Sequence, residues 1–76
     1  MSEMIDLEAF ASDLWMDRDA AMMGLRQAAV EIGISAATLS RLERGEMPDL
    51  ETYVKCCRWM TVDVDVFIHP DKTVIA

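Results

Sequence analysis

The sequence contains no apolar run that approaches the roughly 20 residues needed to cross a membrane. Its first residues, MSEMIDLE, are acidic, whereas the start of a secretory signal is basic. We therefore expect a cytoplasmic protein that has no membrane partner.

Cysteine and histidine are scarce. The two cysteines, Cys56 and Cys57, are adjacent, so a disulfide between them would be strained. His69 is the single histidine, and no His or Cys cluster has the spacing of metal ligands. The sequence predicts no disulfide, no metal site and no cofactor, and His69 is expected to lie in a loop.

The groups that catalysis requires are missing as well. There is no Ser-His-Asp set and no glycine-rich phosphate loop with a lysine, and the carboxylates scatter over positions expected to face solvent. The sequence therefore predicts a protein that is not an enzyme.

The chain has 76 residues, of which 53% are hydrophobic. That is enough for one domain, spanning residues 1–76, with a single modest core. Domains of this size bury only about 60% of the surface of the unfolded chain, so we expect marginal stability.

The segment 25–45, LRQAAVEIGISAATLSRLERG, has the clearest pattern. Gly33 separates two apolar series with helical spacing and can adopt the positive φ that ends a helix. Ser35 suits the N-cap position of the next helix, where its hydroxyl can accept a hydrogen bond from one of the first backbone amides. Gly45 is expected to end that helix. The small side chain of Ala29 lets two helices cross closely. The two series are Ala28, Ala29 and Ile32, then Ile34, Leu39 and Leu42. The pattern favours a helix-turn-helix over its alternative, an ordinary hairpin in a small helical bundle.

The stretch GISAATLSRLERG, followed by PDLETYVKCCRWM, resembles the lambda-repressor-like helix-turn-helix family, the Cro, phage-repressor and XRE class of DNA-binding regulators. The resemblance covers about residues 7–68. It rests on the combination of Ala29, Gly33, Leu39 and Leu42 with the ending Glu43-Arg44-Gly45. It implies an all-α fold, a compact five-helix DNA-binding domain to which a short C-terminal β-strand could be added for dimerisation.

Helical periodicity also places the flanking elements. Asp6 caps a first helix over Leu7–Arg18, and residues 22–25 lead into the second. A third helix is expected over Ser35–Arg44. Asp49 caps a fourth helix, whose apolar stripe is expected to be Leu50, Tyr53, Val54, Cys57 and Met60.

Residues 62–68, VDVDVFI, give conflicting signals. Alternation of valine and aspartate is typical of a strand, whereas the resemblance implies a short fifth helix. We favour the helix, over Asp63–Ile68.

The resemblance also assigns contacts with DNA. In this family the third helix lies in the major groove, with its N-terminal residues facing base edges. Arg41 is the strongest candidate reader, because a guanidinium can bridge O6 and N7 of a guanine. The residues expected to face bases are Ser35, Ala36, Ala37, Ser40 and Arg41, and those expected to contact phosphates are Arg26, Thr38 and Arg44. The family often places a salt bridge where Arg18 and Glu43 fall, which would orient the third helix.

The formal net charge of −7 opposes DNA binding, but it is unevenly distributed. Residues 1–23 carry a net charge of −5 and residues 46–76 a net charge of −3, whereas residues 24–45 carry +1. The expected recognition unit is the only part that is not acidic. We expect weak binding to non-specific DNA.

A two-fold dimer is expected, because one recognition helix with a single strong reader cannot select a site among many competitors. The β-prone tail would pair with the tail of a second copy as an antiparallel strand. The residues expected at this interface are Val66, Phe67, Thr73, Val74 and Ile75.

The function predicted is a sequence-specific DNA-binding regulator of bacterial or phage origin, most simply a Cro-like repressor that occupies a promoter as a homodimer on double-stranded DNA. The alternative is a helix-turn-helix fold that binds protein, as an antirepressor or an antitoxin-like partner. The acidic N-terminal third favours this alternative.

Overall fold

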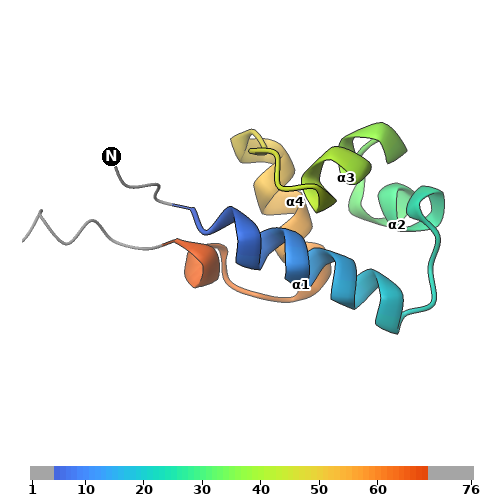
Figure 1. Ribbon diagram of the computed structural model, residues 1–76, viewed down its shortest axis with the longest axis horizontal. Coiled ribbons are helices and arrows are strands. Elements are labelled where there is room, and N and C mark those ends of the chain that lie inside the picture. The colour runs from blue at the N-terminus through green and yellow to red at the C-terminus, as the bar shows by residue number, and fades with distance from the viewer. Residues whose placement is uncertain (1–4, 69–76) are drawn as a thin grey trace, which may run out of the picture.

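The computed structural model describes residues 5–68, and these residues form an all-α fold (Figure 1). Four α-helices are followed by one short 3₁₀-helix. Their bounds are α1 Leu7–Ala20, α2 Leu25–Ile32, α3 Ala36–Glu43, α4 Leu50–Met60 and η1 Val64–Phe67. α2 packs against α3 and α4, and α1 packs against α3, α4 and η1. The predicted all-α class is confirmed. No helix of the described residues is long and apolar enough to cross a membrane.

Three polar side chains start helices as predicted. Each accepts a hydrogen bond from the backbone amide three residues later, which satisfies a donor that the first turn leaves free. The bonds join Asp6 Oδ1 to Ala9 N at 3.0 Å, Ser35 Oγ to Thr38 N at 3.0 Å, and Asp49 Oδ1 to Thr52 N at 2.8 Å. The first residues of α1, α3 and α4 are therefore determined locally.

The turn between α2 and α3 also follows the sequence pattern. Gly33 ends α2 in the left-handed region at φ 96°, which a residue with a Cβ rarely adopts. Gly45 has the same φ after α3. Ala29 is almost fully buried, and its methyl group leaves room for α3 to cross α2 closely. These features confirm the predicted helix-turn-helix.

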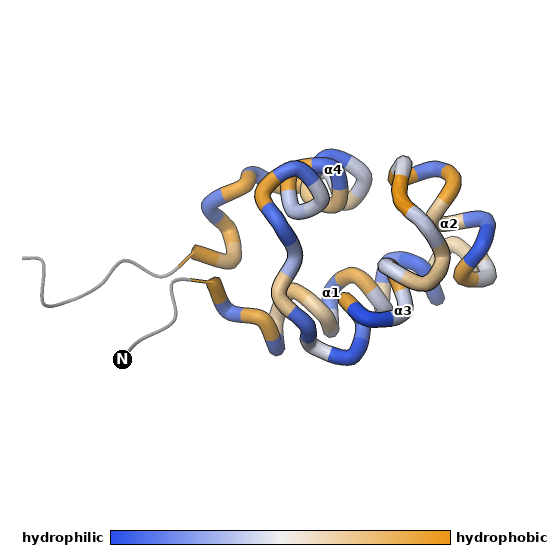
Figure 2. The backbone as a smooth tube through the Cα atoms, turned by 90° about the horizontal axis from the view of Figure 1, so that it is seen from above, coloured by the Kyte–Doolittle hydropathy of each residue, from blue (hydrophilic) through white to orange (hydrophobic). Residues whose placement is uncertain are grey.

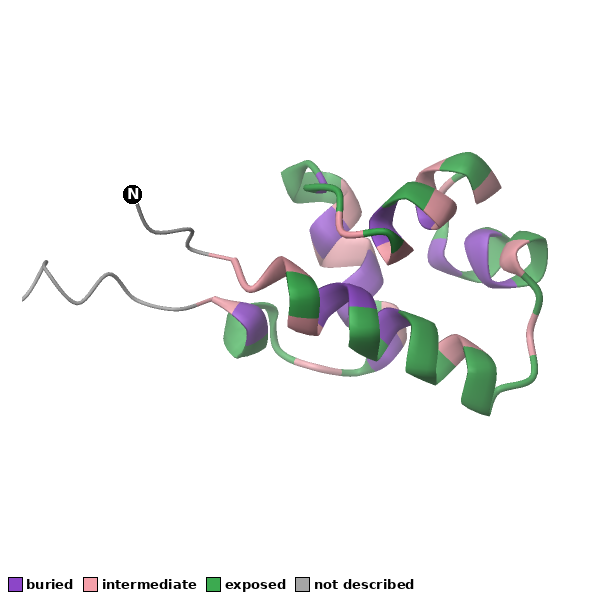
Figure 3. Ribbon diagram, viewed as in Figure 1, coloured by how far each residue is buried: buried purple, intermediate pink, exposed green. Residues whose placement is uncertain are grey.

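One apolar core lies between the helices, where the buried surfaces of α1, α3 and α4 face inward (Figure 3). Every helix contributes to it. Its members are Phe10, Leu14, Ala28, Ala29, Ile32, Leu39, Leu42, Tyr53, Cys56, Cys57, Met60 and Phe67. The aromatic ring of Phe10 is central, because it contacts the rings of both Tyr53 and Phe67 at centroid distances of 5.3 and 5.4 Å.

The predicted apolar stripe of α4 was partly wrong. Leu50 is 78% exposed, because it is the first residue of the helix and lies before the turn that meets the core. Cys56 takes a core position that the sequence pattern assigned to Val54. Cys56 and Cys57 are buried as free thiols, and burial raises the pKa of Cys56 to about 12. A thiol with that pKa is protonated at neutral pH and is a poor nucleophile.

The expected fifth helix over Asp63–Ile68 is instead a 3₁₀-helix over Val64–Phe67. Val64, Asp65 and Val66 are exposed, so the segment has no apolar stripe with helical spacing to bury. Its anchors are Phe67, which enters the core, and the hydroxyl of Tyr53, which donates a hydrogen bond to the Val64 carbonyl.

Phe67 was expected at a dimer interface, and this expectation was wrong. Its side chain is 2% exposed and packs edge-to-face on Phe10, so no surface is left for a second chain. Val66 is 52% exposed and remains accessible. The other residues of the expected interface, Thr73, Val74 and Ile75, lie outside the described residues, as does His69.

The two ends of the described chain meet. Ile5 and Ile68 form an isolated antiparallel β-bridge, and the Asp6 amide donates a hydrogen bond of 2.7 Å to the Phe67 carbonyl. Figures 1 and 2 show this bridge region at the end of the molecule away from α2. This pairing was not predicted from the sequence.

Candidate nucleic-acid interface

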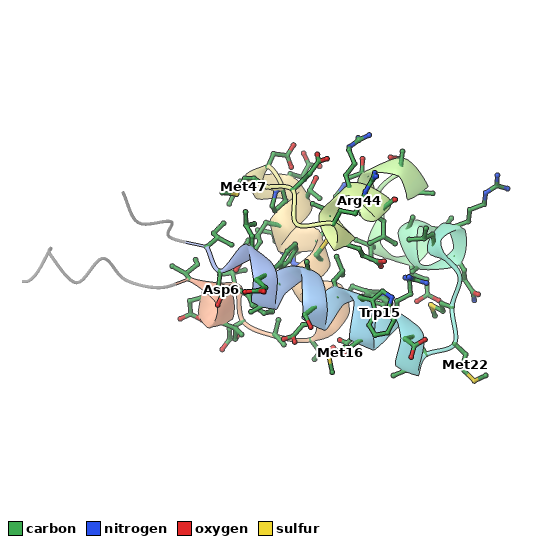
Figure 4. The ribbon with its side chains drawn as sticks, viewed as in Figure 1. Asp6, Trp15, Met16, Met22, Arg44 and Met47 are labelled. Atoms are coloured by element: carbon green, nitrogen blue, oxygen red, sulfur yellow. The ribbon has the colours of Figure 1, made fainter. Side chains whose placement is uncertain are left out.

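The outer face of α3 carries most of the predicted contact residues. Ser35, Ala37, Arg41 and Arg44 are exposed. The predicted contacts Ala36, Thr38 and Ser40 are half-buried, and the opposite face of α3 is fixed in the core. Arg44, at the C-terminal cap of α3, projects outward (Figure 4). The helix thus presents a short polar face ending in two arginines.

Local hydrogen bonds organise the start of that face. The Ser35 hydroxyl donates to the Thr38 hydroxyl at 2.8 Å, while it accepts from the Thr38 amide. Arg41 Nη2 reaches the same Thr38 oxygen at 3.5 Å. The threonine hydroxyl is therefore already partnered within the helix, and Arg41 lies along the helix surface.

Arg41 is held only weakly in this position. Its Nε atom lies 3.9 Å from a carboxylate oxygen of Glu46, and both side chains are at least half exposed. A pair of this kind contributes about 0–1 kcal/mol and is screened by salt. The guanidinium can leave it for a base edge at small cost, although Glu46 also places a negative charge beside the interface.

A partly buried ion pair ties the C-terminal end of α3 to α1. Arg18 donates from Nε and Nη2 to the two carboxylate oxygens of Glu43 at 2.7 and 2.9 Å, and from Nη1 to the Met23 carbonyl at 3.0 Å. The exposed fractions of the two side chains are only 17% and 10%. Hydrogen bonding to Glu43 raises the pKa of Arg18. The salt bridge that the resemblance implied is confirmed, and it fixes the orientation of α3 on α1.

Two further contacts position the helix-turn-helix on α4. Trp59 Nε1 donates to a carboxylate oxygen of Glu31 at 3.1 Å, and Lys55 Nζ donates to the Gly33 carbonyl at 3.2 Å. The sequence pattern predicted neither contact, because each joins residues far apart in the chain and depends on how α4 packs against α2. A polar residue on the solvent side of a helix gives no sequence signal for such a partner.

Another expected phosphate contact, Arg26, lies at the N-terminus of α2. Its cap residue, Gly24, supplies no side chain to accept from the first amides, and Arg26 is exposed in the first turn. Free amides at a helix start favour an anion, and the helix dipole adds to this preference. Arg26 and these amides could contact a phosphate group together.

A helix-turn-helix family model matches residues 16–67, more than half of the chain. The chain belongs to the XRE and lambda-repressor-like helix-turn-helix family. Searches of curated proteins and of solved structures found no match to this chain. Membership of the helix-turn-helix family supports a role as a DNA-binding regulator.

Proposed function

We propose that this helix-turn-helix protein is a sequence-specific repressor that binds an inverted-repeat operator as a homodimer, in the manner of a Cro-type regulator. The observation that supports this most strongly is the outward face of α3, which ends in Arg41 and Arg44 and is held in place by the Arg18–Glu43 pair. Arg41 would read a guanine, and Arg26, Thr38 and Arg44 would contact phosphates. Ser35, Ala36, Ala37 and Ser40 would supply the remaining contacts with bases.

The operator can be found by sequencing random DNA fragments that the purified full chain retains. On the selected site, Arg41→Ala is expected to weaken binding by about 1–3 kcal/mol and to remove the preference at one base pair in each half-site. The measurement is a titration of the selected site and its single-base variants. Unchanged binding on the selected site would contradict the role of Arg41.

Arg44→Ala is the matched variant, because it removes a second exposed arginine from the same helix end. A phosphate contact carries no sequence information, so all DNA sequences should be bound more weakly to a similar extent. The slope of log K against log salt should become shallower by about one unit. A change in base preference would contradict the phosphate assignment.

Dimerisation is expected to depend on the tail. A variant lacking residues 72–76 should sediment as a monomer, keep its helical content by circular dichroism, and lose specific DNA binding. The full chain should sediment as a dimer at micromolar concentration. Dimers in both samples would place the interface elsewhere, and monomers in both would refute the dimer.

The second candidate function is binding of a protein partner by the same fold. The outer face of α1 favours it, because that face is acidic and exposes Trp15 and Met16. A mobility-shift assay at low salt distinguishes the two functions. A pure protein-binding module should shift neither random DNA nor DNA from upstream of its own gene.

A further inference from the structure

A shallow groove separates α1 from the end of α3. Its volume is about 340 Å³, and its surface is mostly apolar. Trp15, 48% exposed, forms part of its wall, and Figure 4 shows the indole on the outside of α1. The residues that line the groove are Glu8, Ala11, Ser12, Trp15, Glu43, Arg44 and Gly45. An indole exposed to this extent beside a groove is typical of a binding surface, because its burial contributes much of the affinity in protein complexes.

The charges beside the groove follow one flank of α1. Glu8, Ser12, Trp15 and Asp19 are spaced by four, three and four residues, so they lie on the same side of the helix. At 1.5 Å per residue, Glu8 lies about 10 Å from Trp15 along the helix axis and Asp19 about 6 Å on the other side. Within residues 5–68 neither carboxylate forms a salt bridge. Trp15 is thus flanked on both sides by a carboxylate, and the Asp19 carboxylate also attracts the neighbouring Arg18 electrostatically.

We infer that this groove binds a short basic helix of a partner protein, with an apolar side chain against Trp15 and cationic side chains opposite Glu8 and Asp19. Laying the apolar face of an amphipathic helix into a groove is a common mode of peptide recognition. A lysine or arginine next to the indole would add a cation–π contact.

Charge complementarity selects this occupant. The exposed carboxylates of α1 are Glu8, Asp13, Asp17 and Asp19, and the one cation of this helix, Arg18, is paired with Glu43. The α1 side of the groove is therefore acidic, although Arg44 adds a positive charge on the α3 side. A second copy of this chain would bring another acidic surface, since the chain has a net charge of −7. The carboxylates of α1 repel nucleic acid from this groove. A basic segment is attracted by the same charges.

Arg44 connects the groove with the DNA-binding face, because it lines the groove and is also an expected phosphate contact. Its guanidinium does not pair with a basic peptide, so a bound peptide would compete with a DNA backbone only by occupying the space beside Arg44. This competition rests on the proposed function. Peptide binding itself does not, and it is measured without DNA.

The probe is a fluorescein-labelled 12-residue amphipathic helix of lysine, leucine and alanine, titrated with the full chain at physiological salt. Its controls are a scrambled peptide of the same composition and a peptide with glutamate in place of lysine. We expect Trp15→Ala to weaken binding of the lysine peptide by at least about tenfold, as for a central aromatic contact. The matched variant Met22→Ala removes a side chain that is 91% exposed in the α1–α2 loop and should leave affinity within twofold.

A second pair of variants distinguishes binding of the peptide in the groove from its general attraction to an acidic protein. The double variant Glu8→Gln/Asp19→Asn should weaken the lysine peptide about threefold to tenfold, because two flanking charges are lost. Asp63→Asn/Asp65→Asn removes the same charge beside η1 and should have less than a twofold effect. Amide shifts in a labelled sample should map to residues 8–19 and 43–45.

Four results would overturn the inference. These are equal binding of the scrambled peptide, equal losses for the two double variants, unchanged affinity of Trp15→Ala when its helical content is intact, and a change in sedimentation of Trp15→Ala without peptide. The last result would show that a second copy covers the groove. Failure of DNA binding with peptide binding intact would refute only the proposed function.

Discussion

Replacing Phe67 with alanine is expected to lower the free energy of unfolding by about 3–5 kcal/mol. The ring is 2% exposed and packs on Phe10, so its removal leaves a cavity between η1 and α1. A chain of this length has a total stability of about 4–11 kcal/mol, so the variant should be partly unfolded at 37 °C. Urea denaturation followed by circular dichroism measures the loss.

Val66→Ala is the matched variant, because it truncates the adjacent, half-exposed side chain of η1. Its effect on unfolding should stay within about 0.5 kcal/mol. The difference between the two variants tests the corrected position of Phe67 in the core. A loss below about 1 kcal/mol for Phe67→Ala would show that η1 does not unfold with the rest of the domain.

Glu43→Gln is expected to destabilise the fold by about 1–3 kcal/mol, the usual cost of removing one partner of a charged hydrogen-bonded pair. The substitution removes the negative charge that faces a partly buried guanidinium, and breaking such a pair from one side leaves an uncompensated charge with limited access to water. Arg18 keeps its hydrogen bond to the Met23 carbonyl. The expected loss of stability is therefore smaller than for a charge that has no partner. Urea denaturation again measures the change.

Two controls accompany this variant. Glu46→Gln removes a carboxylate from an exposed pair with a 3.9 Å distance and should change stability by less than about 1 kcal/mol. The double variant Arg18→Met/Glu43→Met replaces the pair with apolar side chains of similar length and should recover most of the loss. Equal effects of Glu43→Gln and Glu46→Gln would contradict the role assigned to the Arg18–Glu43 pair.

Where the fold depends on local chemistry, the sequence was sufficient to predict it. Asp6, Ser35 and Asp49 each accept from an amide three residues away, and Gly33 adopts the positive φ that its position requires. These interactions span a single turn, so they can be inferred from neighbouring residues. The family resemblance added one contact between distant residues, the salt bridge of Arg18 with Glu43.

The parts that the sequence did not predict depend on tertiary packing. Phe67 belongs to a segment whose alternating pattern suits a strand, yet its position is decided by the space beside Phe10. Leu50 is apolar and sits in a helix, yet it is exposed because the first turn of α4 extends beyond the core. The groove beside Trp15 exists only because α1 and the end of α3 are brought together. Periodicity finds the inward face of a helix but not the residues that its neighbours leave uncovered.

Because Ile5 and Ile68 are paired, the helices can keep the same arrangement in space while their order along the chain is changed. Residues 5 and 68 can be joined by a short linker in place of the segments that flank them, and new ends can then be opened in a surface loop. The α1–α2 loop suits such an opening, because Met22 lies there in the left-handed region at φ 58° and is almost fully exposed. Cutting the chain at this residue would release its backbone strain, and a circularly permuted domain would begin with the helix-turn-helix and finish with α1.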